Sequence, residues 1–336
     1  MERSCVELDH GSGGEAAREL VADLIVSRLD NPFLRPMDDS AVLELEAGRL
    51  AMTTDSYVVD PVFFPGGNIG SLAVHGTVND LSMQGAAPAY LTMGLILEEG
   101  LPLEDLARIL DAAAGAAREA GVVVVAGDTK VVPRGHADRI FINTAGIGRI
   151  PDGVDVSARN ARPGDVVLIN GPIGDHGIAI LSKREGLDFH MPISSDSASL
   201  NALVAALLRS CTSVHVLRDP TRGGVATALN EIAAASGVGI HLKENRLPVN
   251  ASVLSACEML GMDPLYVANE GKCLAVLPAE EGEKALEAMR ADPRGEGARI
   301  IGEVVEDHPG RVVLQTGVGG RRILSTLTGE QLPRIC

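Results

Sequence analysis

The chain has 336 residues, a formal net charge of −16, and a composition in which 46% of the residues are hydrophobic and 22% charged. That length exceeds what one hydrophobic core supports, so we expect two domains. The acidic balance argues against nonspecific binding to nucleic acid or to anionic membranes, because both need a basic protein surface. No apolar run reaches the roughly 18 to 20 residues that span a bilayer, and residues 1–20 lack the apolar core of a secretory signal. We therefore expect a soluble protein of the cytoplasm.

The five cysteines are scattered and include no CxxC pair, so the sequence predicts neither a disulfide framework nor a zinc site. They are Cys5, Cys211, Cys257, Cys273 and Cys336. We expect the first four to be buried apolar residues. Cys336 is the last residue and follows a glycine-rich approach, so we expect an exposed thiol on a mobile arm that could carry a covalently bound group. The alternative is a frayed end that happens to finish on cysteine.

The N-terminal region begins with a glycine-rich stretch, His10-Gly11-Ser12-Gly13-Gly14, followed by apolar residues in helical spacing over residues 15–29. A glycine-rich loop before a helix can present backbone N–H groups to an anion, so Gly11, Gly13 and Gly14 are candidate phosphate contacts. A flexible leader would have the same composition.

The next segments predict an α/β domain. We expect strands over residues 50–56, 90–97, 122–126 and 139–147, and a helix over residues 103–120 with proline before it and glycine after it. Periodicity leaves residues 70–84 open between helix and strand. The strand over 122–126 leads into a loop, Gly127-Asp128-Thr129-Lys130.

Carboxylates recur at the ends of these elements, at Asp38 with Asp39, Asp55, Asp80 beside Asn79, and Asp128. Magnesium takes oxygen ligands and leaves room for water and phosphate, so such a set predicts one or more magnesium–nucleotide centres. The alternative for each residue is a capped turn or helix. The sequence has no GxxxxGK[ST] loop, so ATP would need another binding architecture.

A polar, turn-rich seam over residues 151–165 predicts a domain boundary. The second half opens with a strand over 166–169 and a glycine-rich turn over 171–177. Asp219 begins Asp-Pro-Thr-Arg-Gly-Gly before a helix over 225–235, and Glu270 follows an apolar strand over 265–268. We expect an N-terminal segment (1–35), an N-terminal domain (36–152), a C-terminal domain (153–315) and a flexible tail (316–336), with both domains of mixed α and β structure.

The order of motifs resembles an ATP-dependent superfamily that includes aminoimidazole ribonucleotide synthetase, selenophosphate synthetase and thiamine monophosphate kinase. The motifs are Asp-Asp-Ser-Ala-Val, Thr-Thr-Asp-Ser, Val-Asn-Asp-Leu, Gly-Asp-Thr-Lys and Asp-Pro-Thr-Arg-Gly-Gly. Three stretches resemble one branch, the HypE hydrogenase maturation factors: residues 10–14, residues 127–132, and the terminal Pro333-Arg334-Ile335-Cys336. Selenophosphate synthetases have a Cys or selenocysteine closely followed by Lys near the N-terminus. Here Val6 and Glu7 follow Cys5, which counts against that branch.

The resemblance implies a PurM-like homodimer whose N-terminal α/β domains share a β-barrel, with ATP at the interface and a C-terminal α+β domain beside it. It implies an ATP-dependent carbamoyl dehydratase that makes cyanide ligands for the iron of [NiFe] hydrogenase. In this family HypF delivers a carbamoyl group to the terminal thiol, ATP drives its dehydration to a thiocyanate, and the nitrile passes to iron on a HypC–HypD complex.

The resemblance also assigns roles to residues. Cys336 is the expected nucleophile, and Lys130 and Glu270 are candidates for charge stabilisation and proton transfer, against the alternatives of a surface lysine and a solvated glutamate. The candidate ATP contacts are Gly11, Gly13, Gly14, Asp38, Asp39, Asp55, Asn79, Asp80, Asp128 and Thr129. The candidate magnesium ligands are Asp39, Asp55, Asp80, Asp128 and Asp219.

Two other functions remain open at this point. The chain could be an ATP-dependent synthetase or kinase of the same superfamily that acts on a small molecule, in which case Cys336 would be dispensable. It could also be a noncatalytic thiol carrier between partner proteins, which would hydrolyse no ATP and would tolerate Asp128→Asn.

Overall fold

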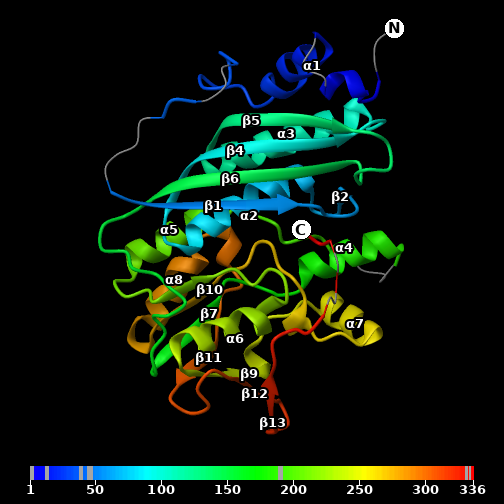
Figure 1. The fold of residues 1–336 in the computed structure, drawn as a ribbon. Coiled ribbons are helices and arrows are strands. Elements are labelled where there is room, and N and C mark those ends of the chain that lie inside the picture. The colour runs from blue at the N-terminus through cyan, green and yellow to red at the C-terminus, as the bar shows by residue number, and fades with distance from the viewer. Residues whose placement is uncertain are drawn as a thin grey trace.

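The computed structural model describes residues 4–11, 15–37, 41–43, 48–187, 192–329, 332 and 334–336, and two sheets divide it into an N-terminal and a C-terminal domain (Figure 1). The N-terminal domain follows a 3-10 turn (Leu8–Gly11), α1 (Glu15–Glu19) and a π-helix (Leu20–Val26). It consists of β1 (Arg49–Tyr57), β2 (Phe63–Phe64), β3 (Gly67–Asn68), α2 (Ile69–Met83), β4 (Ala87–Glu98), α3 (Leu103–Ala120), β5 (Val123–Val132) and β6 (Ile140–Ile150).

The C-terminal domain contains the longer sheet. Its strands are β7 (Asp165–Ile169), β8 (Val216–Arg218), β9 (Gly239–Lys243), β10 (Leu274–Pro278), β11 (Arg299–Val305), β12 (Val312–Gln315) and β13 (Arg321–Leu324). Its helices are α4 (Asp175–Glu185), α5 (Asn201–Ser210), α6 (Gly224–Ser236), α7 (Ala251–Leu260) and α8 (Gly282–Arg290). Short 3-10 turns lie at Glu244–Arg246, Pro264–Tyr266, Ala279–Glu281 and Pro293–Gly295.

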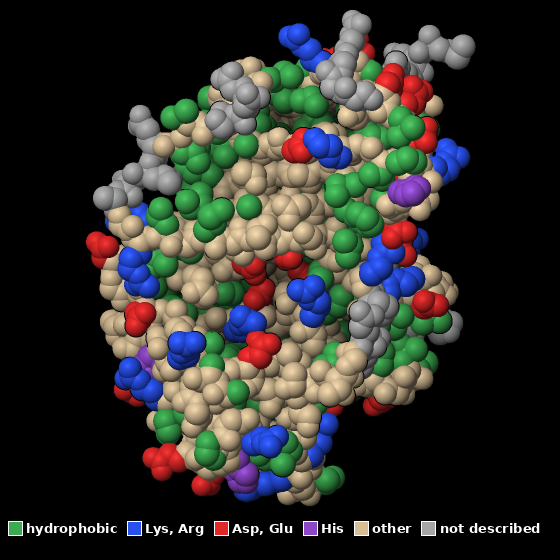
Figure 2. Space-filling model, viewed as in Figure 1, with side chains coloured by type: hydrophobic (Ala, Val, Ile, Leu, Met, Phe, Trp, Pro, Cys, Tyr) green, Lys and Arg blue, Asp and Glu red, His purple; other side chains and the backbone are tan. Residues whose placement is uncertain are grey.

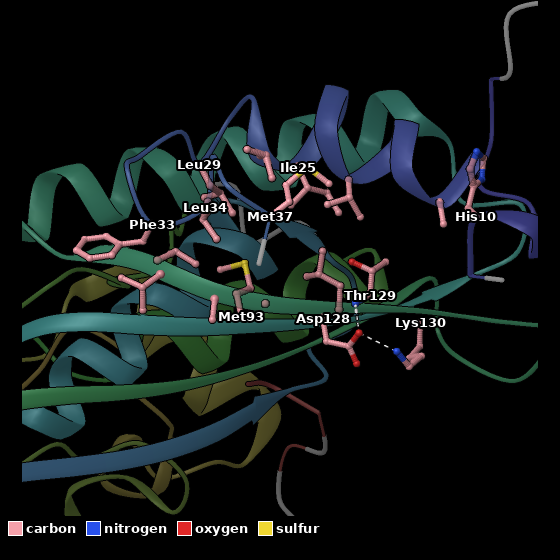
Figure 3. Close-up of a pocket in the computed structure, with 18 of the residues that line it drawn as sticks. His10, Ile25, Leu29, Phe33, Leu34, Met37, Met93, Asp128, Thr129 and Lys130 are labelled. Carbon is pink, nitrogen blue, oxygen red and sulfur yellow. Dashed lines mark hydrogen bonds and ion pairs between the residues drawn. The ribbon is translucent and has the colours of Figure 1, made fainter. Parts of the chain in front are cut away.

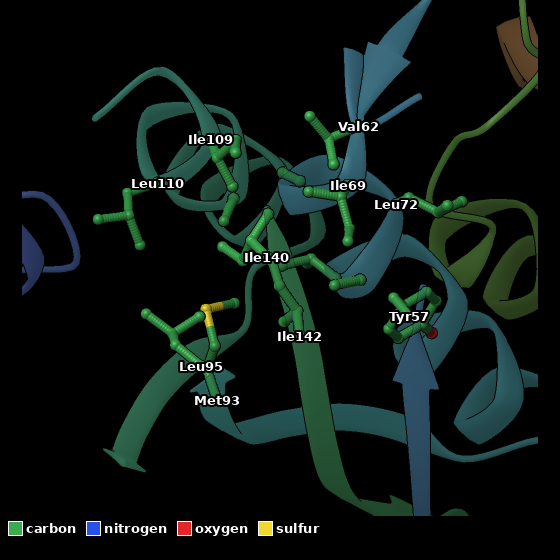
Figure 4. Close-up of a cluster of buried hydrophobic side chains, with 14 of the residues drawn as sticks. Tyr57, Val62, Ile69, Leu72, Met93, Leu95, Ile109, Leu110, Ile140 and Ile142 are labelled. Carbon is green, nitrogen blue, oxygen red and sulfur yellow. The ribbon is translucent and has the colours of Figure 1, made fainter. Parts of the chain in front are cut away.

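The N-terminal sheet has the strand order β1-β6-β4-β5, antiparallel except for the parallel β4–β5 pair. Residues alternate along β1, so Ala51 and Tyr57 are buried on one face while Met52 is 78% exposed on the other. Helices α2 and α3 cover the buried face, where Tyr57 and Ile142 of the sheet lie near Ile69 and Ile109 of the helices (Figure 4). No described helix packs on the opposite face, which we call the outward face (Figure 1).

The two helices of this domain differ in how visible they are in the sequence. The predicted helix over residues 103–120 is confirmed as α3, which begins after Pro102 and ends at Gly121 in a left-handed conformation with φ of 70°. The open segment over 70–84 forms α2, capped by Asn68 and Ser71 in a reciprocal capping box. Gly70 allows the two helices to touch, because a Cβ there would lie 2.1 Å from the carbonyl oxygen of Ile109.

The C-terminal sheet has the order β13-β12-β9-β11-β7-β10-β8 and is covered on both faces. Along β7, Val167 and Ile169 pack with residues of α6, whereas Leu168 packs with residues of α5 and α8. Burial on both faces explains why this strand is continuously apolar over residues 166–169. The predicted two-domain fold of mixed α and β structure is therefore confirmed, although the N-terminal sheet of one chain is open and does not close into a barrel.

Three local predictions are wrong. Residues 127–130 continue β5 as a strand, because β4 pairs with β5 along its whole length and Gly127 fits against the carbonyl of Met93. Glu270 does not end a strand, since residues 264–266 form a 3-10 turn and β10 begins only at Leu274. Residues 321–324 form β13 on the C-terminal sheet, so part of the predicted flexible tail is an edge strand.

The cysteines follow the expectation in part. Cys211, Cys257 and Cys273 are buried, but Cys5 is only half-buried and Cys336 is half-buried and packed against the N-terminal core, so the expected exposure of Cys336 is wrong in this conformation. None of the helices in the described ranges is long and apolar enough to cross a membrane. The cytoplasmic location stays a prediction.

Candidate active site

Acidic side chains gather in a hollow between the two domains, below the end of β1 (Figure 2). Asp80 of α2 lies against β1, where the hydroxyl of Thr53 donates to its Oδ2 at 2.9 Å. Burial raises the pKa of Asp80, and the nearby negative charge of Asp55 adds to that effect. Asp219, which directly follows β8, has its pKa raised to about 6 by burial and then by the charge of Asp80. Burial and mutual repulsion therefore both disfavour the charged forms of these two acids in the hollow.

Glu270 lies in the same region on the loop before β10, and its side chain is only 4% exposed. Its backbone N–H donates to Oδ1 of Asp196 at 3.1 Å, while its side-chain Oε1 is buried and has no hydrogen-bond partner among the described residues. Burial, followed by the charges of Asp219 and Asp196, raises the pKa of Glu270 well above its usual value. A buried carboxyl group of this kind holds its proton more tightly than a free carboxyl group and can exchange it with a bound group.

Asn79 fixes the position of Glu270. Its side-chain amide donates to the carbonyl of Glu270 at 3.2 Å and to that of Ala198 at 3.0 Å, and its Oδ1 accepts from the N–H of Leu200 at 2.8 Å. These contacts join α2 to two loops of the C-terminal domain. The structure thus gives Asn79 a role in joining the domains, and a role as an ATP contact stays a prediction.

The C-terminus lies at this same site (Figure 1). The N–H of Val58 donates to the terminal oxygen of Cys336 at 3.0 Å, and the side chain of Ile335 is buried in the N-terminal core. The pKa of the Cys336 thiol is raised to about 12 by burial and then by the charge of Glu270. The thiol and the buried acid are therefore electrostatic neighbours, as the predicted catalytic pair requires.

A cavity of about 330 Å³ opens beside the tail. It is lined by Cys336 and other tail residues together with Arg222, Gly223 and Ala268 of the C-terminal domain. The positive charge of Arg222 acts on Asp80 and on the Cys336 thiol. The cavity gives a group attached to the sulfur room beside a cation.

Asp128 and Lys130 lie elsewhere in one chain. The cross-strand row Ser56–Asn143–Gly94–Asp128 places Asp128 on the outward face, three strand spacings or about 14 Å from β1. The ammonium of Lys130 donates to Asp128 at 2.7 Å, and this contact lowers the pKa of Asp128. Within a single chain, two of the predicted catalytic residues, Cys336 and Glu270, lie at the same site, and the third, Lys130, lies away from them.

A second cavity, of about 350 Å³, lies between the N-terminal helical segment and β5 (Figure 3). Ile25, Leu29, Phe33 and Met93 make most of its wall apolar, and Thr129 points toward it from β5, while Asp128 and Lys130 point to the other side of the strand (Figure 3). At Gly11 the N-terminal turn touches β5, because a Cβ there would lie 2.9 Å from the backbone nitrogen of Val131. An apolar pocket with a polar end is the usual shape of a small-molecule site.

The predicted magnesium ligands do not converge on one point. In the described part of the chain no three His, Cys, Asp or Glu side chains are arranged to hold a metal ion. Asp55, Asp80 and Asp219 are electrostatically coupled in the hollow, whereas Asp128 is across the sheet. Asp38, Asp39, Gly13 and Gly14 lie outside the described residues.

Sequence reasoning missed two residues that contact the tail. His176 and Arg184, both on α4, bind backbone carbonyls of residues 335 and 334. His176 lies in the glycine-rich turn that the sequence analysis identified. Its contact is to a backbone carbonyl, which every residue has, so the sequence of the tail does not indicate which residue is bound. Arg222 lies in the Asp-Pro-Thr-Arg-Gly-Gly motif, and a cation in that motif is the sequence signal for its position near Asp80 and the Cys336 thiol.

Comparison with known proteins assigns the chain to a family. Residues 37–150 match the N-terminal domain of AIR synthase related proteins, and residues 162–315 match the C-terminal domain. The chain is 55% identical over 336 residues to "Carbamoyl dehydratase HypE" of Azotobacter vinelandii, covering 100% of this chain and 98% of that protein.

Two solved structures are also similar. A crystal structure of hydrogenase maturation protein HypE in complex with ATP has a TM-score of 0.95 and 55% identity, over 98% of this chain and 99% of that one. A HypE–HypF complex has a TM-score of 0.81 and 52% identity, over 92% of this chain and 99% of the matched chain. On these findings, the chain belongs to the HypE family of carbamoyl dehydratases, within the AIR synthase related proteins.

Proposed function

We propose that this chain matures [NiFe] hydrogenase by dehydrating a carbamoyl group carried on its own Cys336, at the expense of ATP, to a thiocyanate that donates cyanide to iron. Family membership supports the reaction. The observation that carries the assignment to these residues is the docking of the tail at Val58, where the Cys336 thiol lies close enough to the buried acid Glu270 for that charge to raise the pKa of the thiol.

The reaction needs phosphate as a leaving group. Transfer of the γ-phosphoryl group of ATP to the oxygen of Cys–S–C(=O)–NH2 gives ADP and a phosphorylated amide. The C–O bond then breaks, phosphate leaves, both N–H protons are lost, and the nitrogen electron pairs form Cys–S–C≡N. Overall, the thiocarboxamide and ATP give thiocyanate, ADP and phosphate.

Glu270 suits the proton transfers. Burial raises its pKa well above the ordinary value, so the carboxyl group is a stronger base than a free glutamate and can take up and return a proton at the bound group. We assign Lys130 to charge stabilisation at the transferring phosphoryl group, which would have to approach from the outward face on which Lys130 lies.

For ATP, a HypE structure with ATP bound supports binding by the family. We assign the adenosine to the cavity of about 350 Å³, which falls within the usual range for small-molecule sites. Gly11 and Thr129 line its polar end. There the phosphates would reach the outward face near Asp128.

In the hollow, carboxylates supply negative charge that would attract a magnesium ion, but they do not form a complete set of ligands around one point. Asp55 and Asp80 are hard oxygen donors, and their mutual repulsion, seen in the raised pKa of Asp80, would be relieved by a divalent cation. Because magnesium commonly takes only one or two carboxylates together with substrate phosphates, these two residues would suffice to hold it, and the ion would neutralise phosphate charge.

We further propose a homodimer formed through the outward face. That face exposes Met52, Leu50 and Ile96 in one uncovered sheet, and exposed apolar surface of this kind is typical of an interface. A second copy would also bring another Lys130 and Asp128 into the space above the sheet. The single chain leaves both residues away from Cys336.

Two partner proteins complete the proposal. A HypE–HypF complex among the similar structures supports a HypF-type carbamoyl donor. Transfer of the finished nitrile to iron on a HypC–HypD complex follows from the resemblance alone and stays a prediction.

Intact-mass measurement tests the function directly. We expect wild-type protein, incubated with HypF, carbamoyl phosphate and ATP, to gain a carbamoyl adduct of about 43 Da. That adduct should convert to a cyano adduct of about +25 Da only when both ATP and Mg²⁺ are present. Cys336→Ala should gain neither adduct, whereas the control Cys5→Ala should gain both. ATP consumption on a free small molecule without any adduct would favour a synthetase. A carbamoyl adduct that never loses water, with no ATP hydrolysis, would favour a carrier.

A further inference from the structure

The last three residues of the tail dock beside residues 58–60, which directly follow β1. The N–H of Val58 donates to the oxygen of Cys336 at 3.0 Å, and the N–H of Asp60 donates to the carbonyl of Arg334 at 3.2 Å. In these two bonds the residue number rises along one segment and falls along the other, so the tail lies antiparallel to residues 58–60. The carbonyl of Ile335, between them, faces the other way.

Helix α4 binds that other side. The Nε2–H of His176 donates to the carbonyl of Ile335 at 2.6 Å, since a carbonyl can only accept. The opposite ring nitrogen, Nδ1, must then accept from the hydroxyl of Ser195 at 2.8 Å. His176 is completely buried, and burial lowers its pKa, which keeps the ring in this neutral form.

Arg184 makes the second contact from α4. Its guanidinium donates to the carbonyl of Arg334 at 2.7 Å and to the carbonyl of Asp60 at 2.6 and 2.8 Å. One side chain thus ties the tail to the segment on which the tail docks. The three terminal residues all have their carbonyl oxygens bound, and Ile335 adds a buried apolar anchor.

We propose that His176 and Arg184 are positioning residues for dehydration, which hold the backbone of Arg334 and Ile335 so that the modified Cys336 stays beside Glu270. This inference rests on the proposed function. The two residues bind backbone carbonyls and not sulfur, so they hold the thiol, the thiocarboxamide and the thiocyanate alike. Their loss should therefore shift the tail outward in every chemical state, which favours the step at the donor protein and disfavours the step at Glu270.

Arg184→Met tests the proposal in a side chain that is not fully buried, and Lys183→Met, at the exposed neighbour, is the matched control. The first readout is alkylation of Cys336 by iodoacetamide in the protein alone, followed by mass spectrometry of the C-terminal peptide. Loss of charge-assisted hydrogen bonds predicts alkylation about tenfold faster in Arg184→Met. The control should react at the wild-type rate.

The second readout separates the two steps. In the carbamoyl donor system, Arg184→Met should acquire the +43 Da adduct at least as fast as wild type and convert it to +25 Da about tenfold more slowly. His176→Leu should behave in the same way, and His176→Gln, which restores a donor, should recover part of the rate. Unchanged dehydration in Arg184→Met, whether or not alkylation is faster, would overturn the proposal. If wild type gained no adduct, the proposed function would fail, while the alkylation rates would still decide whether α4 holds the tail.

Discussion

The side-chain amide of Asn79 donates to the backbone carbonyl of Glu270 at 3.2 Å, so one residue of α2 holds the buried acid of the other domain. Asn79→Ala leaves that carbonyl, the carbonyl of Ala198 and the N–H of Leu200 without this partner. Because buried polar groups without partners are costly, we expect a loss of about 2–4 kcal/mol in the free energy of unfolding by urea. Asn201→Ala, which removes a single bond to the carbonyl of Ala120, should cost about 1 kcal/mol. Equal losses in the two variants would contradict the role of Asn79.

Asp219 should make stability depend on pH. Its pKa is about 6 in the folded protein against an ordinary value of 3.8, so the folded state binds its proton more tightly. Such a group stabilises the fold below about pH 3.8, and that contribution is lost as the pH rises through 6. The difference between the two pKa values corresponds to about 3 kcal/mol in the free energy of unfolding.

Asp219→Asn removes this titration. Relative to wild type, the variant should gain up to about 3 kcal/mol in unfolding free energy between pH 4 and pH 7.5, measured with urea in the presence of EDTA. Asp152→Asn, at an exposed position, should show no such trend. A difference between Asp219→Asn and wild type that does not change with pH would show that Asp219 ionises freely in the folded protein.

The sequence predicted α3 well and α2 poorly for one reason. Helix α3 has a polar face, so its apolar residues recur with helical spacing. Helix α2 is buried on nearly all sides between the sheet, α3 and the C-terminal domain, so no polar face marks its period. The spacing of apolar residues identifies elements that are buried on one face, but it does not identify elements that are buried on all sides.

The candidate site shows a similar limit. Cys336 and Asp80 were identified from motifs, and Glu270 was assigned correctly to the C-terminal domain, but its burial depends on Asn79 and Asp196, which are distant in sequence. The docking of the tail depends on backbone carbonyls, which every residue has. Asp128 and Asp55 are separated because their strands lie at opposite edges of the sheet. The residue pattern of a single strand does not predict the order of strands in a sheet.

The docked tail should also control the reactivity of its thiol. Ile335 is 4% exposed, and its truncation to alanine removes the apolar anchor of the tail. In wild type the pKa of Cys336 is about 12, so alkylation should still accelerate above pH 10. In Ile335→Ala the released thiol should titrate nearer to the free value of about 8.5 and react faster at pH 8. Ile323→Ala, at a position 57% exposed on β13, should leave the profile unchanged. Identical profiles in all three proteins would place the reactive thiol outside the docked state.

Gly11 should be sensitive to any side chain. A Cβ there would lie 2.9 Å from the backbone nitrogen and the Cβ of Val131, so Gly11→Ala must push the N-terminal turn away from β5. We expect a loss of about 1–3 kcal/mol in stability and weaker ATP binding by calorimetry, because the turn lines the proposed adenosine cavity. Gly115→Ala in α3 meets nothing within 4 Å and should stabilise the protein by about 0.5–1 kcal/mol. If Gly11→Ala bound ATP as tightly as wild type, the adenosine would have to bind elsewhere.

The outward face of the N-terminal sheet should determine the oligomeric state. Met52 is 78% exposed on β1, the strand at one edge of that face, and a charge placed there would be buried without a partner if a second copy covered it. We therefore expect Met52→Glu to convert a dimer to a monomer in native mass spectrometry and light scattering, and to abolish ATP-dependent dehydration. Met259→Glu, at a position 66% exposed on α7, introduces the same charge on another surface and should remain dimeric. A dimer that survives Met52→Glu would mean that the copies meet through a different surface, and Lys130 would then need another route to Cys336.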